Sequence, residues 1–504
     1  MIWTTACLVH SWLNEHFRSD SWNAALSAIC QLSFPPGQVG SSKDIDLTTA
    51  ADRTMPEQLL ATLRTVCPEV ALDIASHWDK PVTDYAGHLI RPVPAPRSEI
   101  AIRSRAILRQ ALGDRVKAIL PVADHDNVLA AFDRHPVIQA GVHSQLLFDR
   151  ITFNAFLLGW LGAVEQRLPA FFVFTGTTVT METVGKEGPG WLDLGDQQIN
   201  LFGMGRHKLC RQSVAGAGPV SLNIDALRAV GSTHPGLEQL VVQAGRKWGN
   251  AADAMADVNS QLVASWDAAI TTSPVFFDDR HAALALARHL DDENGLITRL
   301  LTDPTRRMAL EQALEAAATG PFGRFLPIAT THFWGVREKR VRKMTVADGR
   351  LIEVDRPQGV SVPLERQALR DALQNGILLP NLFFLFLVMS LLPRVRVLGG
   401  FRQIGYVPVF QGVLRDLLNR DNPDEAALLE ELTTLENAWG MRVIEESQSV
   451  FDQIGAHAPG KLLGELRQIY SKRRFADVTD GLRLLSESPR WRKLARTLGI
   501  APAA

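Results

Sequence analysis

The side chains best suited to chemistry follow two short apolar runs in the middle of the chain. PVIQAG (136–141) continues into Val142-His143-Ser144-Gln145, and PAFFVFTG (169–176) continues into Thr177-Thr178. Histidine titrates near neutral pH and can transfer protons, while hydroxyl and amide groups donate and accept hydrogen bonds. This pattern predicts a site for a polar metabolite. The catalytic candidates are His143, Thr177 and Thr178, and the substrate-binding candidates are Gly141, Gln145 and Thr175.

A helix is expected between these two runs. DRITFNAFLLGWLGAVEQRL (149–168) has apolar residues at helical spacing on a broad face. A strand, a helix of about 18 residues and a second strand form a βαβ unit, because parallel strands need a crossover connection of about this length. Open α/β sheets bind ligands at the carboxyl ends of such strands. We therefore expect His143 and Thr177 to lie over one binding site.

Two later segments have the same character. SPVFFDDRH (273–281) has an apolar pair before acidic residues, which suggests another buried strand end. Residues 395–415 contain a strand-like run, Gly399-Gly400 and a second apolar segment. The predicted binding site therefore combines residues 139–145, 175–178 and 399–406. In the last of these, Arg402 can bind a carboxylate or phosphate bidentately, Gln403 is a hydrogen-bonding catalytic candidate, and Tyr406 is a substrate-binding candidate.

The loop Gly203–Lys208 (GMGRHK) combines flexible backbone with three potential cations. Backbone N–H groups and a fixed guanidinium could hold a phosphate or carboxylate there, so Arg206 and His207 are substrate-binding candidates. The loop lacks the P-loop pattern GxxxxGK[ST] and does not clearly connect a strand to a helix. A solvated basic turn is the favoured interpretation.

Other motifs favour structural roles. Ala123–Asn127 (ADHDN) has the residue types of a metal or acid–base cluster, but no further ligand spacing accompanies it, and an acidic residue before VLAAF is typical of a helix N-cap. Arg337–Lys343 (REKRVRK) is basic, yet no aromatic residues are interleaved to stack bases, so a solvated sheet edge is favoured. The isolated histidines are interpreted as surface or satisfied core residues: His234, His281, His289 and His457.

Composition and charge limit the class of protein. The 504 residues carry 53 Lys and Arg against 54 Asp and Glu, for a formal charge of −1, so no global field attracts nucleic acid or an anionic membrane. The four cysteines are scattered, which argues against a disulfide framework and a structural zinc site. The first residues lack the basic start and apolar core of a signal peptide. We expect a cytoplasmic protein without nucleic-acid partners, and a homo-oligomer is compatible with the sequence.

Residues 377–392 (ILLPNLFFLFLVMSLL) are the most apolar stretch. A membrane-spanning helix needs about 20 apolar residues, and a run this short more often lies in a buried core. We therefore interpret it as core and consider membrane association the weaker alternative.

The expected fold is α/β, with a Rossmann-like parallel sheet core, a β-hairpin and additional helical regions at both ends. Residues 1–97 form an N-terminal helical region, with loops after residue 30 and over residues 80–97. Residues 98–420 form the core, with a helical insertion at about 220–320 and a hairpin at 332–354, in which Asp348-Gly349 is a two-residue turn. Residues 421–504 form a C-terminal helical region.

The order of these features resembles the family of cysteine ligases that completes bacillithiol biosynthesis. That family begins its Rossmann-like core with a strand ending in a tGQQaGL-type turn, and this chain has QAGVHSQL (139–146). The family later has a segment like LLPtlaYvgGPGEiaYwaQL, and this chain has Leu378–Asn381 followed by LGGFRQIGY (398–406). The resemblance implies an amine-to-carboxylate condensation. However, the family's Glu-Asp-His-Asp cluster is replaced by TGTTVT (175–180), and the glutamate after its glycine turn is replaced by Gln403.

Those replacements remove the family's best general-base candidates, because threonine and glutamine cannot act as carboxylate bases near neutral pH. The leading hypothesis is therefore a small-molecule biosynthetic enzyme of ligase type, forming a C–N bond on a polar metabolite, and the family's cysteine specificity is not carried over. His143 is its acid/base, Arg402 its anion anchor and a nucleotide a candidate cofactor. No metal ligands are assigned. The alternative is a non-catalytic nucleotide- or metabolite-binding protein that kept the fold.

Overall fold

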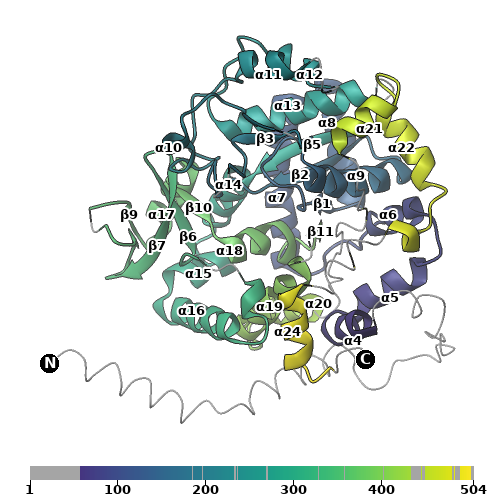
Figure 1. Ribbon diagram of the computed structural model, residues 1–504. Coiled ribbons are helices and arrows are strands. Elements are labelled where there is room, and N and C mark those ends of the chain that lie inside the picture. The colour runs from purple at the N-terminus through teal and green to yellow at the C-terminus, as the bar shows by residue number, and fades with distance from the viewer. Residues whose placement is uncertain are drawn as a thin grey trace.

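Figure 1 shows the computed structural model of the chain. It describes residues 57–183, 186–195, 197–231, 234, 236–267, 271–326, 329–356, 358–400, 402–432, 444, 449–478, 482 and 488–500. The helix predicted within residues 1–30 lies outside this range. The helical segment predicted between the two loops of this region is present as α4 (Glu57–Val66) and α5 (Pro68–His77).

A four-stranded parallel sheet lies at the centre of the molecule. Its strands are β1 (Val137–Gln139), β2 (Ala170–Thr175), β5 (Ser273–Asp278) and β11 (Arg396–Leu398), in the order β11-β1-β2-β5. The neighbouring strands pair in parallel throughout, with Ile138 opposite both Phe172 and Val397. The mixed α/β fold with a parallel sheet is therefore confirmed. The strand predicted at SPVFFDDRH is β5, which joins this sheet within an otherwise helical stretch.

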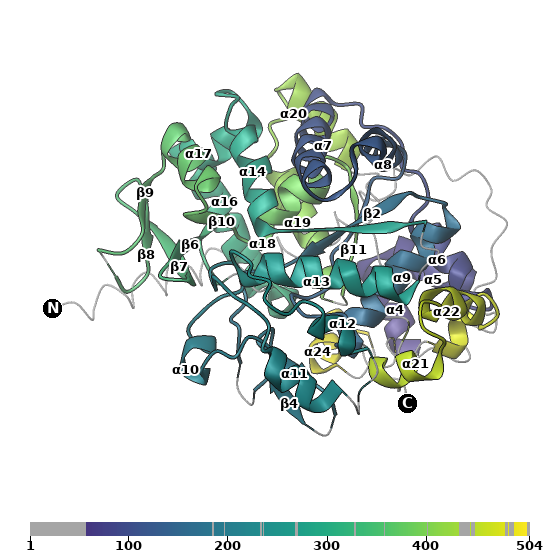
Figure 2. The ribbon, with the colours of Figure 1, turned by 90° about the horizontal axis from the view of Figure 1, so that it is seen from above.

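Both faces of the sheet are buried, and the side chains of β2 show why. Phe171 and Val173 point to one hydrophobic cluster, which includes α9 (Arg150–Glu165) and α13 (Ala251–Trp266). Phe172 and Phe174 point to a second cluster, with α7 (Glu99–Ile119), α8 (His125–Arg134) and α14 (Asp279–His289). Figure 2 shows these helices on the two sides of the strands. Parallel strands covered on both faces have continuous apolar sequences, as this one does.

The crossover helix α9 is the helix predicted between β1 and β2. It begins after Asp149, whose side chain accepts the Thr152 N–H, and a close neighbour is α6 (Val82–Leu89). Residues 80–97 were expected to form a loop, and α6 shows that part of this prediction was wrong. The proline-rich end of the segment suggested a loop, but Val82–Leu89 is short and mostly buried against α9, so tertiary contacts decide its structure.

A second, antiparallel sheet has the order β10-β6-β7-β8-β9. The Asp348-Gly349 turn joins β7 and β8, as predicted. The segment before it was expected to be one edge strand, and this was wrong: Glu338 and Lys339, both with positive φ, turn the chain between β6 and β7, and β7 lies inside the sheet. The strands are β6 (Phe333–Arg337), β7 (Arg340–Ala347), β8 (Arg350–Glu353), β9 (Ser361–Pro363) and β10 (Leu378–Pro380).

The apolar run 377–392 is core, as predicted. It forms β10, α18 (Leu382–Phe386) and a π-helical turn η3 (Leu387–Leu391), and its side chains from Phe383 onward are almost completely enclosed, nearly all of them in the second hydrophobic cluster. Within the described residues, no helix has both the length and the apolar character needed to cross a membrane.

The C-terminal helices return to the N-terminal ones. α22 (Leu462–Tyr470) contacts α6, and α24 (Pro489–Thr497) contacts α4, so these C-terminal helices pack against the first described helices of the chain (Figure 1). The other elements are α10 (Arg206–Leu209), α11 (Ile224–Gly231), α12 (Glu238–Val241), α15 (Leu296–Thr302), α16 (Pro304–Thr319), α17 (Arg366–Gln374), α19 (Gln403–Leu417), α20 (Pro423–Leu432), α21 (Val450–Ala456), β3 (Trp191–Asp193), β4 (Gln198–Asn200), η1 (Val122–Asp124), η2 (Gly323–Phe325) and η4 (Phe475–Val478).

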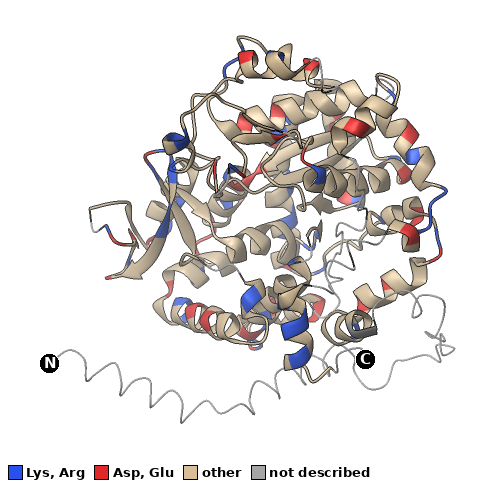
Figure 3. Cartoon of the chain, in the orientation of Figure 1, with Lys and Arg blue, Asp and Glu red and all other residues tan. Residues whose placement is uncertain are grey.

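Acidic and basic residues are interspersed over the described elements (Figure 3). The helix α16 carries both signs, with two arginines near its start and two glutamates further along. By contrast, the charged residues of α24 are all basic: Arg490, Arg492, Lys493 and Arg496. The near-zero net charge therefore comes from mixing of the two signs, with a local basic helix near the C-terminus.

The contact between α9 and α6 requires a glycine. A Cβ atom at Gly162 would overlap the carbonyl oxygen of Ala86, so Gly162→Ala should lower the free energy of unfolding by about 2 kcal/mol or more. The matched control is Gly464→Ala in α22, where a Cβ meets no atom within 4 Å and helix propensity favours alanine by about 1 kcal/mol. Urea unfolding of both variants measures the difference. Equal stability of the two variants would contradict this packing.

Candidate functional site

The carboxyl ends of the four parallel strands meet at one edge of the sheet. Beyond β1 and β2 the pairing continues as a parallel bridge between His143 and Gly176, and the Ser144 hydroxyl donates a hydrogen bond to the Gly176 carbonyl. His143 is exposed at this point. The prediction that the two apolar strands lie side by side, in the same direction, with their polar ends together is confirmed.

From β1 the chain adds β2 and β5 on one side of the sheet, and it then adds β11 on the other side of β1. The boundary between β1 and β11 is therefore the switch point of the sheet. Two buried glutamines lie beside this boundary. Gln139 Nε2 donates to the Ala155 carbonyl (2.6 Å) and its Oε1 accepts the Gly141 N–H (2.8 Å). Gln403 Nε2 donates to the Val397 carbonyl (2.8 Å), and a Cβ at Gly399 would overlap its Oε1. The amide of Gln403 thus holds the end of β11.

The end of β2 is tied to the end of β5 by a carboxylate. The backbone N–H and the hydroxyl of Thr177 both donate to Asp279 Oδ2, the hydroxyl at 2.8 Å. Both side chains are buried, with Thr177 0% and Asp279 2% exposed. Asp279 is the first residue of α14, where the helix N-terminus favours a negative charge.

Asp278 and Asp279 are adjacent but differ in electrostatics. Burial raises the pKa of Asp279 to about 6, and the charge of Asp278 adds to the rise, while the bonds from Thr177 act against it. Burial also acts on Asp278, but the positive charge of Arg280, the neighbouring His281 ring and the hydrogen bonds from Arg280 outweigh it and hold the pKa of Asp278 well below its ordinary value. The edge therefore carries one firmly ionised carboxylate and one that titrates close to neutral pH.

Arg280 links this pair to α13. Its guanidinium bonds both oxygens of Asp278 and donates to Asp253 Oδ1 at 2.7 Å. His281 Nδ1 accepts the backbone N–H of Asp278, which completes a capping box at the start of α14. These contacts fix the turn from which Asp279 projects.

Four of the remaining site candidates lie at or near the strand-end edge. Thr175 Oγ1 donates to the Phe277 carbonyl (3.4 Å) and Thr178 is half-buried, both at the strand-end edge. Gln145 follows His143 in a turn that Asn259 of α13 holds through the Gln145 carbonyl. Arg402 is exposed at the start of α19, where burial of part of the side chain and the positive charge of Arg490 lower its pKa.

Three candidates have other surroundings. Tyr406 packs its ring against Phe386 and Phe410, with centroids 5.2 and 5.6 Å away, so its contacts are those of a core residue. Arg206, in α10, forms an ion pair with the enclosed carboxylate of Glu182 (2.7 Å), and His207 beside it is exposed. The backbone N–H of Tyr406 donates to the Arg402 carbonyl (3.2 Å) within α19, while the described side-chain contacts of Arg206 do not include the strand-end residues.

The carboxylates were absent from the set of site candidates. The signal for them was present, since Asp278 and Asp279 directly follow the apolar run of β5. The same rule that selected His143 and Thr177 applies to them, because all parallel strands end at one edge. In the described part of the chain, no three His, Cys, Asp or Glu side chains gather as metal ligands. The Asp124-His125 motif lies at the start of α8, and Asp124 occupies the N-cap position without a side-chain capping bond.

A comparison with protein-family models found no family that matches this chain. A comparison with curated proteins also found no match. We therefore infer the function from the chemistry of the strand-end edge.

The pKa of Asp279 gives a test by pH. The folded protein binds the proton of Asp279 more tightly than the unfolded chain does, so this contribution to stability is present below about pH 4 and is lost as pH rises through about 6. The free energy of unfolding of the native protein, relative to Asp279→Asn, should fall by about 2–3 kcal/mol between pH 4 and pH 7. Urea unfolding across this range measures it.

Thr177→Val is the matched variant. It removes the hydroxyl that stabilises the ionised carboxylate, so the fall should shift to higher pH. A difference between the native protein and Asp279→Asn that does not change with pH would show that Asp279 is not a raised carboxyl group.

Proposed function

We propose that this chain is a small-molecule biosynthetic enzyme that forms a carbon–nitrogen bond at the carboxyl edge of a Rossmann-like sheet, with Asp279 as the proton acceptor. The observation that carries this proposal is the adjacent pair Asp278 and Asp279, whose pKa values their surroundings drive apart. Carboxylates that are close together but titrate far apart are typical of acid–base catalysis.

The chemistry requires such a group. An amine attacks the carbonyl carbon of an activated carboxyl group, the C–N bond forms, and the bond to the leaving group breaks with its electron pair. The attacking nitrogen must lose a proton, and a general base accelerates this transfer when its pKa lies near the working pH. Asp279 is mostly ionised at pH 7 and still basic enough to accept that proton. A nucleotide that activates the carboxyl group is part of the proposal.

The resemblance to the cysteine-adding ligases supports the same class of reaction. That family places acidic residues after its second core strand, where this chain has Thr177 and Thr178. Here a carboxylate comes to this point from the neighbouring strand instead, because Asp279 accepts both hydrogen bonds of Thr177. Cysteine as the substrate is not carried over.

The spacing of the strands indicates the size of the substrates. Arg402 follows β11 and Asp279 follows β5, which are the two outer strands of the sheet. Three strand spacings of about 4.8 Å place these ends roughly 14 Å apart. An anion held by Arg402 can therefore reach Asp279 only as part of an extended molecule or through a second substrate. Both fit a nucleotide-activated condensation, with His143 between the two ends.

The test begins with a thermal-shift screen of nucleotides and amino acids, followed by mass-spectrometric detection of product. Asp279→Asn should lower turnover by about 10²–10⁴-fold while ligand binding persists, because it removes the base and keeps the shape. Arg402→Ala should weaken binding of the anionic substrate, and Arg420→Ala, an exposed arginine beyond α19, should not. Full turnover in Asp279→Asn, or in both His143→Ala and Arg402→Ala, would refute the assignment.

A non-catalytic metabolite-binding protein is the second candidate. The observation that favours it is the near-complete burial of Thr177 and Asp279, which satisfy each other's hydrogen bonds as a structural tie would. In that case the same screen finds ligands that stabilise the protein, no product forms, and Asp279→Asn changes stability only.

A further inference from the structure

Two arginines from distant parts of the sequence lie near each other beyond the end of β11. Arg402 is the residue before the first turn of α19, and Arg490 is in the first turn of α24. Arg402 is exposed, and Arg490 is half-buried. Burial of part of the side chain and the positive charge of Arg490 lower the pKa of Arg402, so each guanidinium group lies within the electrostatic field of the other.

The packing between the two helices explains why these arginines are close. Trp491, which follows Arg490, is 0% exposed, and its ring stands edge-on to that of Phe325 in η2, with the centroids 6.3 Å apart. Phe325 in turn packs against Gly405 of α19, where a Cβ atom would overlap the Phe325 ring. The start of α24 is therefore held against the start of α19 through one shared aromatic ring.

This pair of arginines has no counter-charge in the part of the chain that the structure describes. Neither Arg402 nor Arg490 has a hydrogen-bond or ion-pair partner there for its side chain, and no carboxylate acts on the pKa of Arg402. The other group that acts on it is the Tyr406 hydroxyl, which is neutral at pH 7 because burial raises its pKa. Like charges repel, so an anion that binds between the two guanidinium groups stabilises both.

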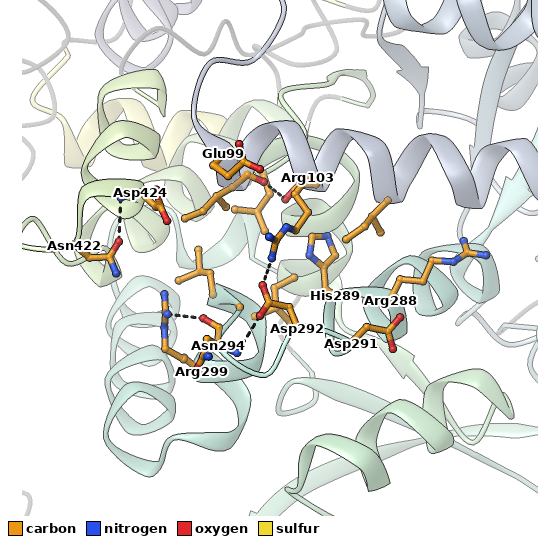
Figure 4. A pocket seen from close by; sticks show the side chains of 17 residues that line it. Glu99, Arg103, Arg288, His289, Asp291, Asp292, Asn294, Arg299, Asn422 and Asp424 are labelled. Carbon is orange, nitrogen blue, oxygen red and sulfur yellow. Dashed lines mark hydrogen bonds and ion pairs between the residues drawn. The ribbon is translucent and has the colours of Figure 1, made fainter.

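The arginines of a separate cavity show the contrast. In the cavity between α7, α14, α15 and α20 (Figure 4), Arg103 forms an ion pair with Asp292, and Arg299 forms one with Glu425. An anion at that cavity competes with carboxylates for these guanidinium groups. An anion at Arg402 and Arg490 meets no such competition from the described residues.

We propose that Arg402 and Arg490 together bind the phosphate chain of a nucleoside triphosphate, with one guanidinium group on each of two phosphate groups. This inference rests on the proposed function, in which a nucleotide activates a carboxyl group, and it identifies the anion that Arg402 holds. One guanidinium matches one carboxylate or one phosphate group, so two of them match a ligand with adjacent anionic groups. A nucleoside triphosphate is also an extended molecule, as the separation of Arg402 from Asp279 requires.

The probes are ATP and AMP, measured by isothermal titration calorimetry on the full chain. ATP should bind at least tenfold more tightly than AMP. Arg490→Met removes the guanidinium group but keeps a long unbranched side chain. It should weaken ATP binding at least tenfold and leave AMP binding nearly unchanged, because Arg402 alone can hold the single phosphate group of AMP. Arg402→Met should weaken the binding of both nucleotides.

The matched control is Arg492→Met. Arg492 is an exposed arginine two residues further along α24, so it lies on a different side of the helix from Arg490. This variant should leave the affinities for ATP and AMP unchanged. A loss of ATP binding as large as in Arg490→Met would overturn the inference, because it would show a diffuse attraction to the basic helix.

Urea unfolding of Arg490→Met separates binding from folding. The variant lacks one of two like charges, so without ligand it should be at least as stable as the native protein, while ATP should stabilise it less. A ligand-free variant that is less stable than the native protein, with unchanged stabilisation by ATP, would show that Arg490 has a structural role only.

Further outcomes would overturn the inference. They are absence of ATP binding, equal affinity for ATP and AMP, unchanged ATP affinity in Arg490→Met, and tighter binding of the dicarboxylate succinate than of ATP. The proposed function fails separately. If ATP binding depends on Arg490 but no C–N product forms, the catalytic proposal is wrong and this site stands. If product forms while ATP binding is independent of Arg490, this inference alone is wrong.

Discussion

Two hydrogen bonds from Thr177 to the Asp279 carboxylate join the ends of β2 and β5, and the chemistry of the sheet edge depends on them. They bring a carboxylate to a strand end whose own sequence has only hydroxyl groups. Burial of that carboxylate raises its pKa to about 6, although the two bonds themselves act against the rise. The neighbouring Asp278 is contacted by Arg280 and His281, which hold its pKa low, so its carboxylate stays ionised. The two adjacent carboxylates therefore have opposite pKa shifts.

This arrangement follows from the parallel direction of the four strands. The strands are mostly apolar because helices cover both faces of the sheet, and most polar residues follow the point where a strand ends. Since all four strands run in the same direction, those polar ends lie on one edge. Gln139 and Gln403 then close the switch point between β1 and β11. The candidate site residues therefore lie along this edge, from Arg402 to Asp279.

Hydrophobic periodicity, together with the rule that polar residues follow buried strands, was sufficient to predict much of this fold from the sequence. They predicted β1, α9, β2, β5 and β11, the buried run 377–392 and the meeting of His143 with the residues after β2. Contacts between distant segments were not predictable. Nothing local indicates that α6 forms against α9, that Glu338-Lys339 turns the chain without glycine, or that Tyr406 packs against Phe386. The acidic residues at the end of β5 are apparent in the sequence. Nothing local indicates that Asp279 is a site residue, because its partner Thr177 lies about a hundred residues earlier in the chain.

The most direct measurement is the titration of the Asp279 carboxyl group itself. Infrared difference spectra of the native protein and Asp279→Asn, recorded from pH 3 to pH 9, isolate its C=O and carboxylate bands. A protonated carboxyl band that disappears with a midpoint near pH 6 is the predicted result, because burial outweighs the bonds from Thr177. A midpoint at or below about 4, the value of an ordinary aspartate, would contradict a raised proton acceptor at this edge.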